Sequence, residues 1–136
     1  MTVDFETPLP TPTPTSAPFW DGLKEGVFRI QKCRDCDRWV FYPRSRCPHC
    51  LSDALAWHEV SGAGTLYTYT IARQPTSPHF AKDVPQRLAV VELDEGVRVT
   101  TTLVDVVDAD IRIGMRVEPV YEAASDDITL LRYRPA

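Results

Sequence analysis

The chain has 136 residues, of which 43% are hydrophobic, and its formal net charge is −4. This length suits one ordinary domain or a small module joined to a larger one, and the acidic balance argues against a general nucleic-acid binder. The sequence holds no apolar run of about 18 residues and no basic, apolar N-terminal signal. We therefore expect a cytoplasmic protein without a membrane span, whose thiols stay reduced.

Residues 1–18 form a proline-rich segment that holds five of the twelve prolines, with threonine in most of the gaps. Such a composition favours an extended chain without a core of its own. We expect an extended tail over 1–18, either as a disordered terminus or as an arm that lies over a partner subunit.

A short helix is predicted after this tail, because Phe19, Trp20, Leu23 and Val27 lie near helical spacing. Pro18 suits the first turn, and a helix of about two turns is too short to be stable alone in water. Two hypotheses follow for its apolar face. It packs on the chain's own domain, or Phe19, Trp20 and Leu23 anchor a partner subunit.

All four cysteines lie in one stretch, as two C-x-x-C pairs separated by ten residues: Cys33, Cys36, Cys47 and Cys50. Two such pairs can form two tight knuckles and hold one Zn²⁺ ion between four thiolates. A four-cysteine site has no open position, so we interpret the zinc as structural. The alternatives are two disulfides or a redox C-x-x-C. His49 could replace a cysteine as ligand, but four thiolates suffice, which favours a spacer role.

Short strands are predicted on both sides of the first cysteine pair, over 27–32 and 38–42, and again over 55–60. We therefore place a helix and zinc-ribbon module at 19–60. Residues 29–50 carry six basic and two acidic side chains, a charge of +4 in a chain whose total is −4. This basic segment is either a solvated surface or a binding place for phosphates, whose geometry arginine matches.

Strand patterns dominate the rest of the chain, over 65–72, 87–93, 97–107, 115–123 and 128–134. In the first of these, alternation places Tyr67, Tyr69 and Ile71 on one face and Leu66 on the other. The loop over 73–86 is longer than most hairpin loops, which favours a functional role. Five antiparallel strands with one irregular connection predict a small OB-type barrel over 61–136, with a β-sandwich as the alternative. The expected fold is mostly β: a short N-terminal helix, a zinc ribbon and a five-stranded OB-fold barrel.

The order of these parts resembles a family known as domain of unknown function thirty-five, which joins a rubredoxin-like zinc ribbon to an OB fold. The resemblance covers about residues 18–122. It rests on Pro18-Phe19-Trp20, Cys33-x2-Cys36, Pro43-Arg44, Cys47-Pro-x-Cys50, Leu55-x-Trp57, Ser61-Gly-x-Gly64-Thr65, Val91-Glu-Leu-Asp-Glu-Gly96 and Ile113-Gly-Met-x-Val117. The chain departs from the family at Pro85-Gln86, where an aromatic residue usually follows the proline.

The resemblance implies a small accessory subunit of a thiolase-superfamily enzyme that acts on acyl-CoA, with the chemistry carried by the partner. An aldolase that cleaves a β-hydroxyacyl-CoA, such as a steroid side chain, is preferred to a thiolase or acyltransferase on analogy alone. A coenzyme A thioester is then the expected ligand. Tyr69, Ile71 and Phe80 suit its apolar, amide-bearing arm, and Arg73 and Arg87 border the same loop and could add charge.

The sequence offers no convincing catalytic group of its own. The cysteines are assigned to zinc, no serine has the context of a nucleophile elbow, and acidic residues in loops are usually solvated. We therefore expect a non-catalytic subunit. The first alternative is a binder of single-stranded nucleic acid, because OB barrels stack bases on aromatic side chains. The second is an independent hydrolase or thioesterase that depends on Asp105 or His79.

Overall fold

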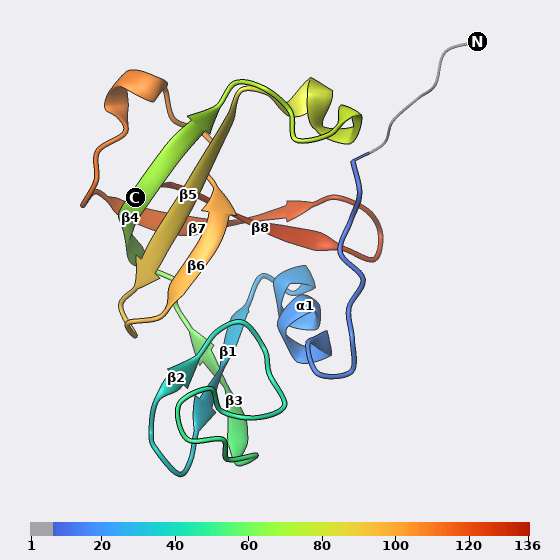
Figure 1. Cartoon of the computed structure of the whole chain (residues 1–136), viewed down its shortest axis with the longest axis vertical. Coiled ribbons are helices and arrows are strands. Elements are labelled where there is room, and N and C mark those ends of the chain that lie inside the picture. The colour runs from blue at the N-terminus through green and yellow to red at the C-terminus, as the bar shows by residue number, and fades with distance from the viewer. Residues whose placement is uncertain (1–6) are drawn as a thin grey trace.

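The computed structural model describes residues 7–136, which fold into one α-helix, two short 3-10 helices and two antiparallel sheets (Figure 1). Residues 1–6 of the predicted tail lie outside the described residues. The elements in chain order are α1 (Ala17–Lys24), β1 (Phe28–Cys33), β2 (Trp39–Val40), β3 (Leu55–Val60), β4 (Gly64–Ala72), a 3-10 helix (Pro78–Asp83), β5 (Gln86–Leu93), β6 (Arg98–Thr102), a second 3-10 helix (Asp108–Asp110), β7 (Arg116–Ala123) and β8 (Thr129–Pro135). Within residues 7–136, no helix has the length and apolar character needed to cross a membrane.

Helix α1 forms where the sequence predicts it, with Pro18 in its first turn, and it packs on β1 and beside β7 and β8. Phe19 and Leu23 are buried in the chain's own core, with 3% and 1% of their surface exposed. The apolar surface of these two residues is thus used within the chain, which favours packing on the chain's own domain, and contact of this helix with a partner subunit stays a prediction. Trp20 remains half-buried, and its indole Nε1 donates to the hydroxyl of Tyr42 at 3.0 Å.

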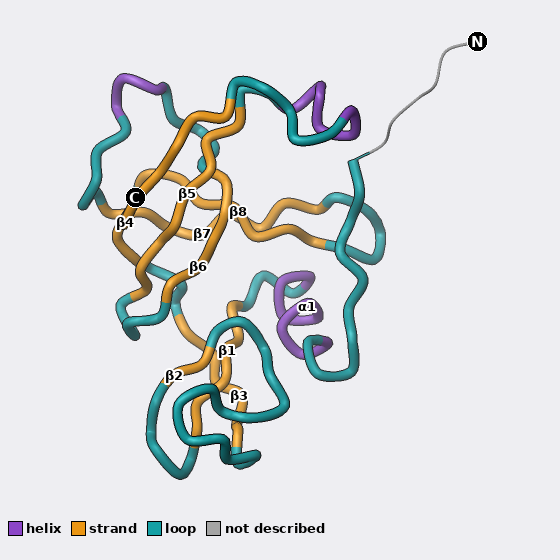
Figure 2. Tube along the Cα trace, viewed as in Figure 1, coloured by secondary structure: helices purple, strands orange, loops and turns teal. Residues whose placement is uncertain are grey.

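The ribbon sheet has the order β2-β1-β3, and Figure 2 shows long loops around its short strands. Strand β2 is shorter than the predicted 38–42, because Phe41 and Tyr42 leave the sheet and pack edge-on against Phe19. Their ring centroids lie 5.6 and 5.8 Å from that of Phe19. The aromatic side chains thereby join the ribbon to α1.

The OB sheet has the order β6-β5-β4-β7-β8, and its first strand in the chain, β4, contains a bulge that the sequence pattern did not show. Leu66 pairs with Val91 and Thr68 with Val90, so Tyr67 is the extra residue between them. Tyr67 is 46% exposed, whereas Leu66 is fully buried. The predicted shared face of Tyr67 and Tyr69 is therefore wrong: Tyr69 packs against the core that contains Leu66, because the bulge exchanges the faces of the residues that follow it.

Among the described residues, the edges of the OB sheet meet at a parallel bridge between Leu103 and Tyr133. Strand β6 ends at Thr102, earlier than the predicted 107, and the chain turns at Asp105, whose φ is 52°. Aspartate tolerates this conformation better than most residues. Within residues 7–136 the five strands form one sheet that is OB-like but not fully closed, which excludes the β-sandwich alternative.

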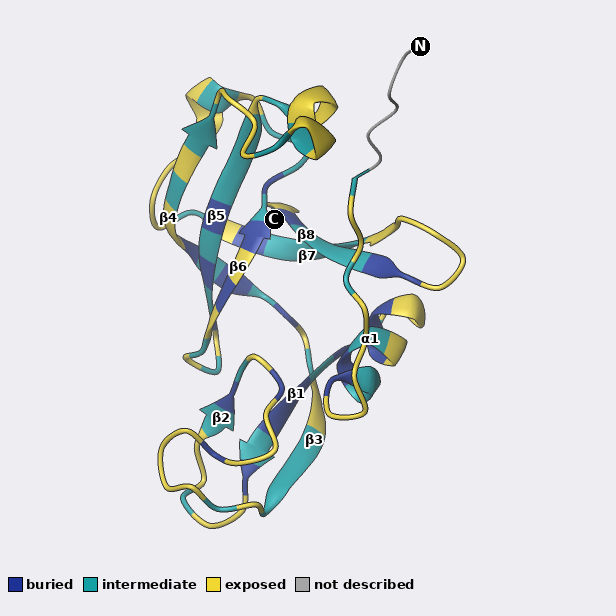
Figure 3. Cartoon of the chain, turned by 45° about the vertical axis from the view of Figure 1, so that its right-hand side comes forward, coloured by how far each residue is buried: buried dark blue, intermediate teal, exposed yellow. Residues whose placement is uncertain are grey.

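The two sheets share one hydrophobic core. Phe28 and Ile30 of β1 belong to the same buried cluster as Leu66 and Val91 of the OB sheet. Figure 3 shows buried residues on β1 and α1 that continue into β5 and β6. Tyr133 adds a buried polar contact, because its hydroxyl donates to the carbonyl oxygen of Gly62 in the connection between the sheets, at 2.7 Å. Changes in the ribbon are therefore expected to affect the stability of the OB sheet.

Candidate functional site

The two cysteine pairs adopt the same local fold. In the first, the backbone N–H of Asp37 donates to the carbonyl oxygen of Cys33 at 2.9 Å. In the second, the backbone N–H of Leu51 donates to the carbonyl oxygen of Cys47, also at 2.9 Å. Asp37 and Leu51 both have positive φ, of 62° and 65°. Each C-x-x-C segment thus forms a tight turn that directs two sulfur atoms to one side.

The four sulfur atoms lie within 4.8 Å of one another. Two separations cross between the knuckles at 3.6 Å, that of Cys33 from Cys50 and that of Cys36 from Cys47. A tetrahedral Zn²⁺ with bonds of about 2.3 Å requires sulfur separations of about 3.8 Å, whereas a disulfide requires about 2 Å. The cysteines are free. The arrangement therefore fits a structural zinc ion and not the disulfide alternative.

Backbone N–H groups donate to sulfur atoms of the cluster, whereas burial and the neighbouring thiols raise the pKa of Cys36 and of Cys50. The N–H of Cys36 donates to the sulfur of Cys33 and lowers the pKa of that thiol to about 7. The N–H of His49 donates to the sulfur of Cys47 at 3.4 Å. The imidazole of His49 lies beside Arg38 instead, with Nδ1 3.3 Å from a guanidinium nitrogen. His49 thus contributes a backbone N–H to the cluster, in agreement with the predicted spacer role.

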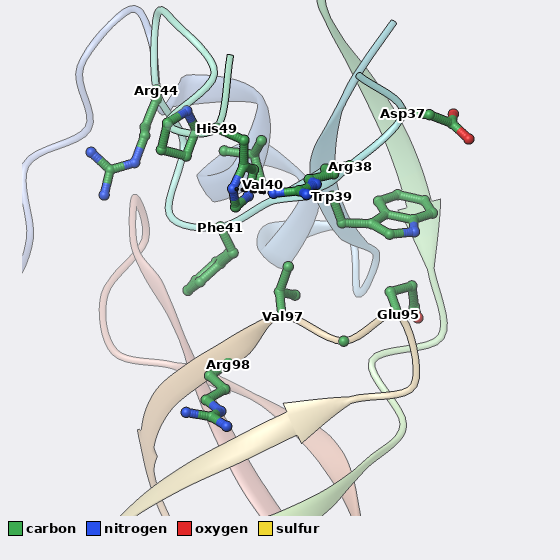
Figure 4. A pocket seen from close by; sticks show the side chains of 12 residues that line it. Asp37, Arg38, Trp39, Val40, Phe41, Arg44, His49, Glu95, Val97 and Arg98 are labelled. Carbon is green, nitrogen blue, oxygen red and sulfur yellow. Dashed lines mark hydrogen bonds between the residues drawn. The ribbon is translucent and has the colours of Figure 1, made fainter. Parts of the chain in front are cut away.

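A pocket of about 630 Å³ lies between the ribbon and the hairpin that joins β5 to β6 (Figure 4). We call it the basic pocket, because Arg38, Arg44 and Arg98 line it together with His49. In Figure 4, Arg38 and Phe41 come from the ribbon side, and Arg98 comes from the OB sheet. The other lining residues are Asp37, Trp39, Val40, Phe41, Pro48, Glu95, Gly96 and Val97.

A second pocket of about 430 Å³ adjoins the first and lies between α1, the segment after β2, and strands β6 and β8. We call it the aromatic pocket. Its lining residues are Phe19, Trp20, Phe41, Tyr42, Arg98, Val99, Thr100, Leu130, Leu131 and Arg132. Phe41 and Arg98 line both pockets, so the two form neighbouring parts of one surface between the ribbon and the OB sheet.

The five residues predicted to bind coenzyme A lie around one end of the β4–β5 hairpin. Ile71 pairs with Arg87 across the two strands, and Arg73 and Phe80 lie in the loop between them. Tyr69 lines a small apolar depression of about 220 Å³, whereas Arg87 lines a separate one of about 360 Å³. Arg87 is also paired with Asp108. The structure thus brings Ile71 and Arg87 together but directs Tyr69 and Arg87 to different surfaces.

The pockets at the ribbon were not predicted as a unit. The sequence indicated a basic segment at 29–50, which contains Arg38 and Arg44, but it gave no sign that Arg98 and Glu95 would face them. These residues come from a hairpin about fifty positions further along the chain. Their proximity follows from the shared core of the two sheets.

A four-cysteine ribbon whose core continues into an OB sheet defines a two-module protein of the zinc-ribbon and OB-fold class. Residues 20–56 match the family model described as the ChsH2 rubredoxin-like zinc ribbon domain, and residues 57–122 match that of the ChsH2 C-terminal OB-fold domain. The chain belongs to the DUF35 family. This confirms the resemblance seen in the sequence.

The relatives include both enzyme subunits and small scaffold proteins. The chain is 34% identical over 110 residues to a DUF35 domain-containing scaffold protein of Methanocaldococcus jannaschii, covering 79% of this chain and 77% of that protein. It is 38% identical over 119 residues to a probable enoyl-CoA hydratase alpha subunit of Thermomonospora curvata, covering 87% of this chain but only 37% of that subunit. The chain therefore spans little more than a third of the hydratase subunit.

A solved structure of a protein described as the Ltp2-ChsH2(DUF35) aldolase gives the corresponding match in three dimensions. The two chains are 34% identical and superpose with a TM-score of 0.81 over 93% of this chain and 98% of the other.

Proposed function

We propose that this chain is the non-catalytic, acyl-CoA-binding scaffold subunit of a thiolase-superfamily enzyme complex. The partner is an aldolase that cleaves a β-hydroxyacyl-CoA by a retro-aldol reaction, with a steroid side chain as the preferred acyl group. A thiolase or acyltransferase partner ranks second. The observation that carries this proposal is the near-complete superposition on the DUF35 chain of a structure described as an aldolase.

In this proposal the four cysteines hold one Zn²⁺ ion whose role is structural. Zinc in a four-thiolate site has no open coordination position, so it supplies folding energy and no Lewis acid for a substrate. Free thiols at Cys33, Cys36, Cys47 and Cys50 suit a reducing cytoplasm. A zinc ion shared by the two knuckles would hold His49 of the second knuckle beside Arg38, which follows the first. The chain's own residues then bind and orient the ligand, and the partner performs the bond cleavage.

The test is capture of the partner from the native source. The affinity-tagged chain, loaded with zinc, should retain a thiolase-superfamily protein that mass spectrometry identifies at a fixed stoichiometry. The captured assembly should cleave an acyl-CoA, and the lone chain should not. Recovery of the tagged chain without any such protein, or acyl-CoA turnover by the lone chain, would contradict the proposal.

A single-stranded oligonucleotide serves as the control ligand in the same experiment. The alternative drawn from the OB fold requires salt-dependent binding of that oligonucleotide by the lone chain. The proposed scaffold role predicts that it does not bind.

A further inference from the structure

Resting on the proposed function, we propose where the ligand lies on this chain. The phosphate-bearing nucleotide end of the CoA thioester binds in the basic pocket, and its pantetheine arm runs through the aromatic pocket. The ligand therefore crosses the junction between ribbon and OB sheet. This differs from the placement at the β4–β5 loop that the sequence suggested.

The first argument concerns the charge that is available to an anion. Across residues 7–136, neither Arg38 nor Arg44 has a carboxylate oxygen within 4.0 Å of its guanidinium. The arginines that form ion pairs in the OB sheet are Arg87, Arg98, Arg116, Arg132 and Arg134. Arg38 and Arg44 thus keep their charge for a phosphate, which an arginine fork matches in shape.

The second argument is that the loop carrying Arg44 is held in place. Gln31 is only 5% exposed, and its side-chain amide forms two hydrogen bonds with the backbone of Arg44. The N–H of Arg44 donates to Oε1 at 2.8 Å, and Nε2 donates to the carbonyl oxygen of Arg44 at 2.9 Å. A buried amide that fixes both backbone groups of one residue positions that residue before any ligand arrives, which lowers the entropy cost of binding.

Two carboxylates also line the basic pocket, and they do not cancel its charge. Asp37 is 3.3 Å from the ammonium of Lys32, which lies on the neighbouring strand and balances it. Among the lining residues that the structure describes, the one remaining negative charge is that of Glu95, and the lining also carries the positive charges of Arg38, Arg44 and Arg98. Arg98 is itself paired with Glu92. A volume of about 630 Å³ falls in the range of small-ligand sites, so a nucleotide fits the space as well as the charge.

The third argument is the chemistry of the adjoining pocket. Trp20, Phe41 and Tyr42 give it an aromatic wall, and Leu130 and Leu131 of β8 line it as well. Narrow, apolar walls with a few polar atoms suit the pantetheine arm. Because Phe41 and Arg98 line both pockets, a ligand that leaves the arginines enters the aromatic pocket directly.

The test is a calorimetric titration of the complex that the zinc-loaded chain forms with its captured enzyme partner. Coenzyme A is the ligand in one titration and pantetheine in the other. We expect the double variant Arg38→Ala/Arg44→Ala to bind coenzyme A at least tenfold more weakly and pantetheine with unchanged affinity. Arg34→Ala is the matched control, because Arg34 is an exposed arginine of the first knuckle and lines neither pocket. That variant should bind coenzyme A as the wild type does.

The outcomes separate this inference from the proposed function. If the double variant binds coenzyme A normally while Arg73→Ala weakens it, the ligand lies at the β4–β5 loop, and the scaffold role is untouched. Equal loss in Arg34→Ala and in the double variant would indicate general attraction of anions and would also overturn the placement. Failure of the chain to form any enzyme complex contradicts the proposed function itself.

Discussion

Replacing Cys47 by serine should remove zinc from the protein and lower the stability of both sheets. Zinc binding by four thiolates contributes roughly 10–16 kcal/mol, as much as the whole stability of an ordinary domain. Cys47 is fully buried, and β1, which enters the first knuckle, supplies Phe28 and Ile30 to the shared core. We expect loss of bound zinc and a Tm lower by roughly 10 °C or more, measured by elemental analysis and circular dichroism.

His49→Ala is the matched control for this variant. It changes one of the two residues between the cysteines of the second knuckle but keeps the backbone N–H that donates to Cys47. Zinc content should stay at one ion per chain with little change in Tm. Full zinc content in Cys47→Ser, or loss of zinc in His49→Ala, would show that the ligand set is not the four cysteines.

Replacing Gly62 by alanine should destabilise the protein by about 2–5 kcal/mol. Gly62 has a φ of 78°, which L-residues adopt at a cost of about 1–2 kcal/mol. A Cβ there would also lie 2.8 Å from Phe28 and 2.9 Å from Pro119, one from each sheet. The clash would force the two modules apart at the short connection between them, and urea unfolding of the zinc-loaded chain measures the cost.

Gly26→Ala is the control that separates the cost of the positive φ from the cost of the steric clash. Gly26 has nearly the same φ, 74°, but a Cβ there would meet nothing within 4 Å. The backbone strain alone should cost about 1–2 kcal/mol. Equal losses for the two variants would mean that close packing at Gly62 contributes nothing, contrary to the shared-core description.

The parts of the fold that the sequence predicted are those fixed by neighbouring residues. The cysteine spacing predicted the two knuckles, because each turn closes between a cysteine and the residue four positions later. Strand β3 was predicted with its observed bounds, 55–60, and β5 and β8 to within one residue at each end. Alternating apolar residues carry this information locally.

What the sequence did not predict depends on residues far apart in the chain. The bulge at Tyr67 follows from pairing with β5, which no alternation in 65–72 records. The sequence left the packing of Phe19 and Leu23 open between two hypotheses, because their burial depends on the fit of α1 against the sheets. The basic pocket joins 37–49 to 95–98, and the shared core brings those segments together.

The most direct test of the scaffold role is a titration of the captured enzyme partner with this chain while acyl-CoA cleavage is followed. The proposal predicts that the partner alone has little activity and that the rate rises until one fixed ratio of the two chains is reached. Zinc-free chain should give no rise. Full activity of the partner without this chain would contradict the proposal that this protein supports another subunit's active site. A cleavage rate that does not change when this chain is added would contradict it as well.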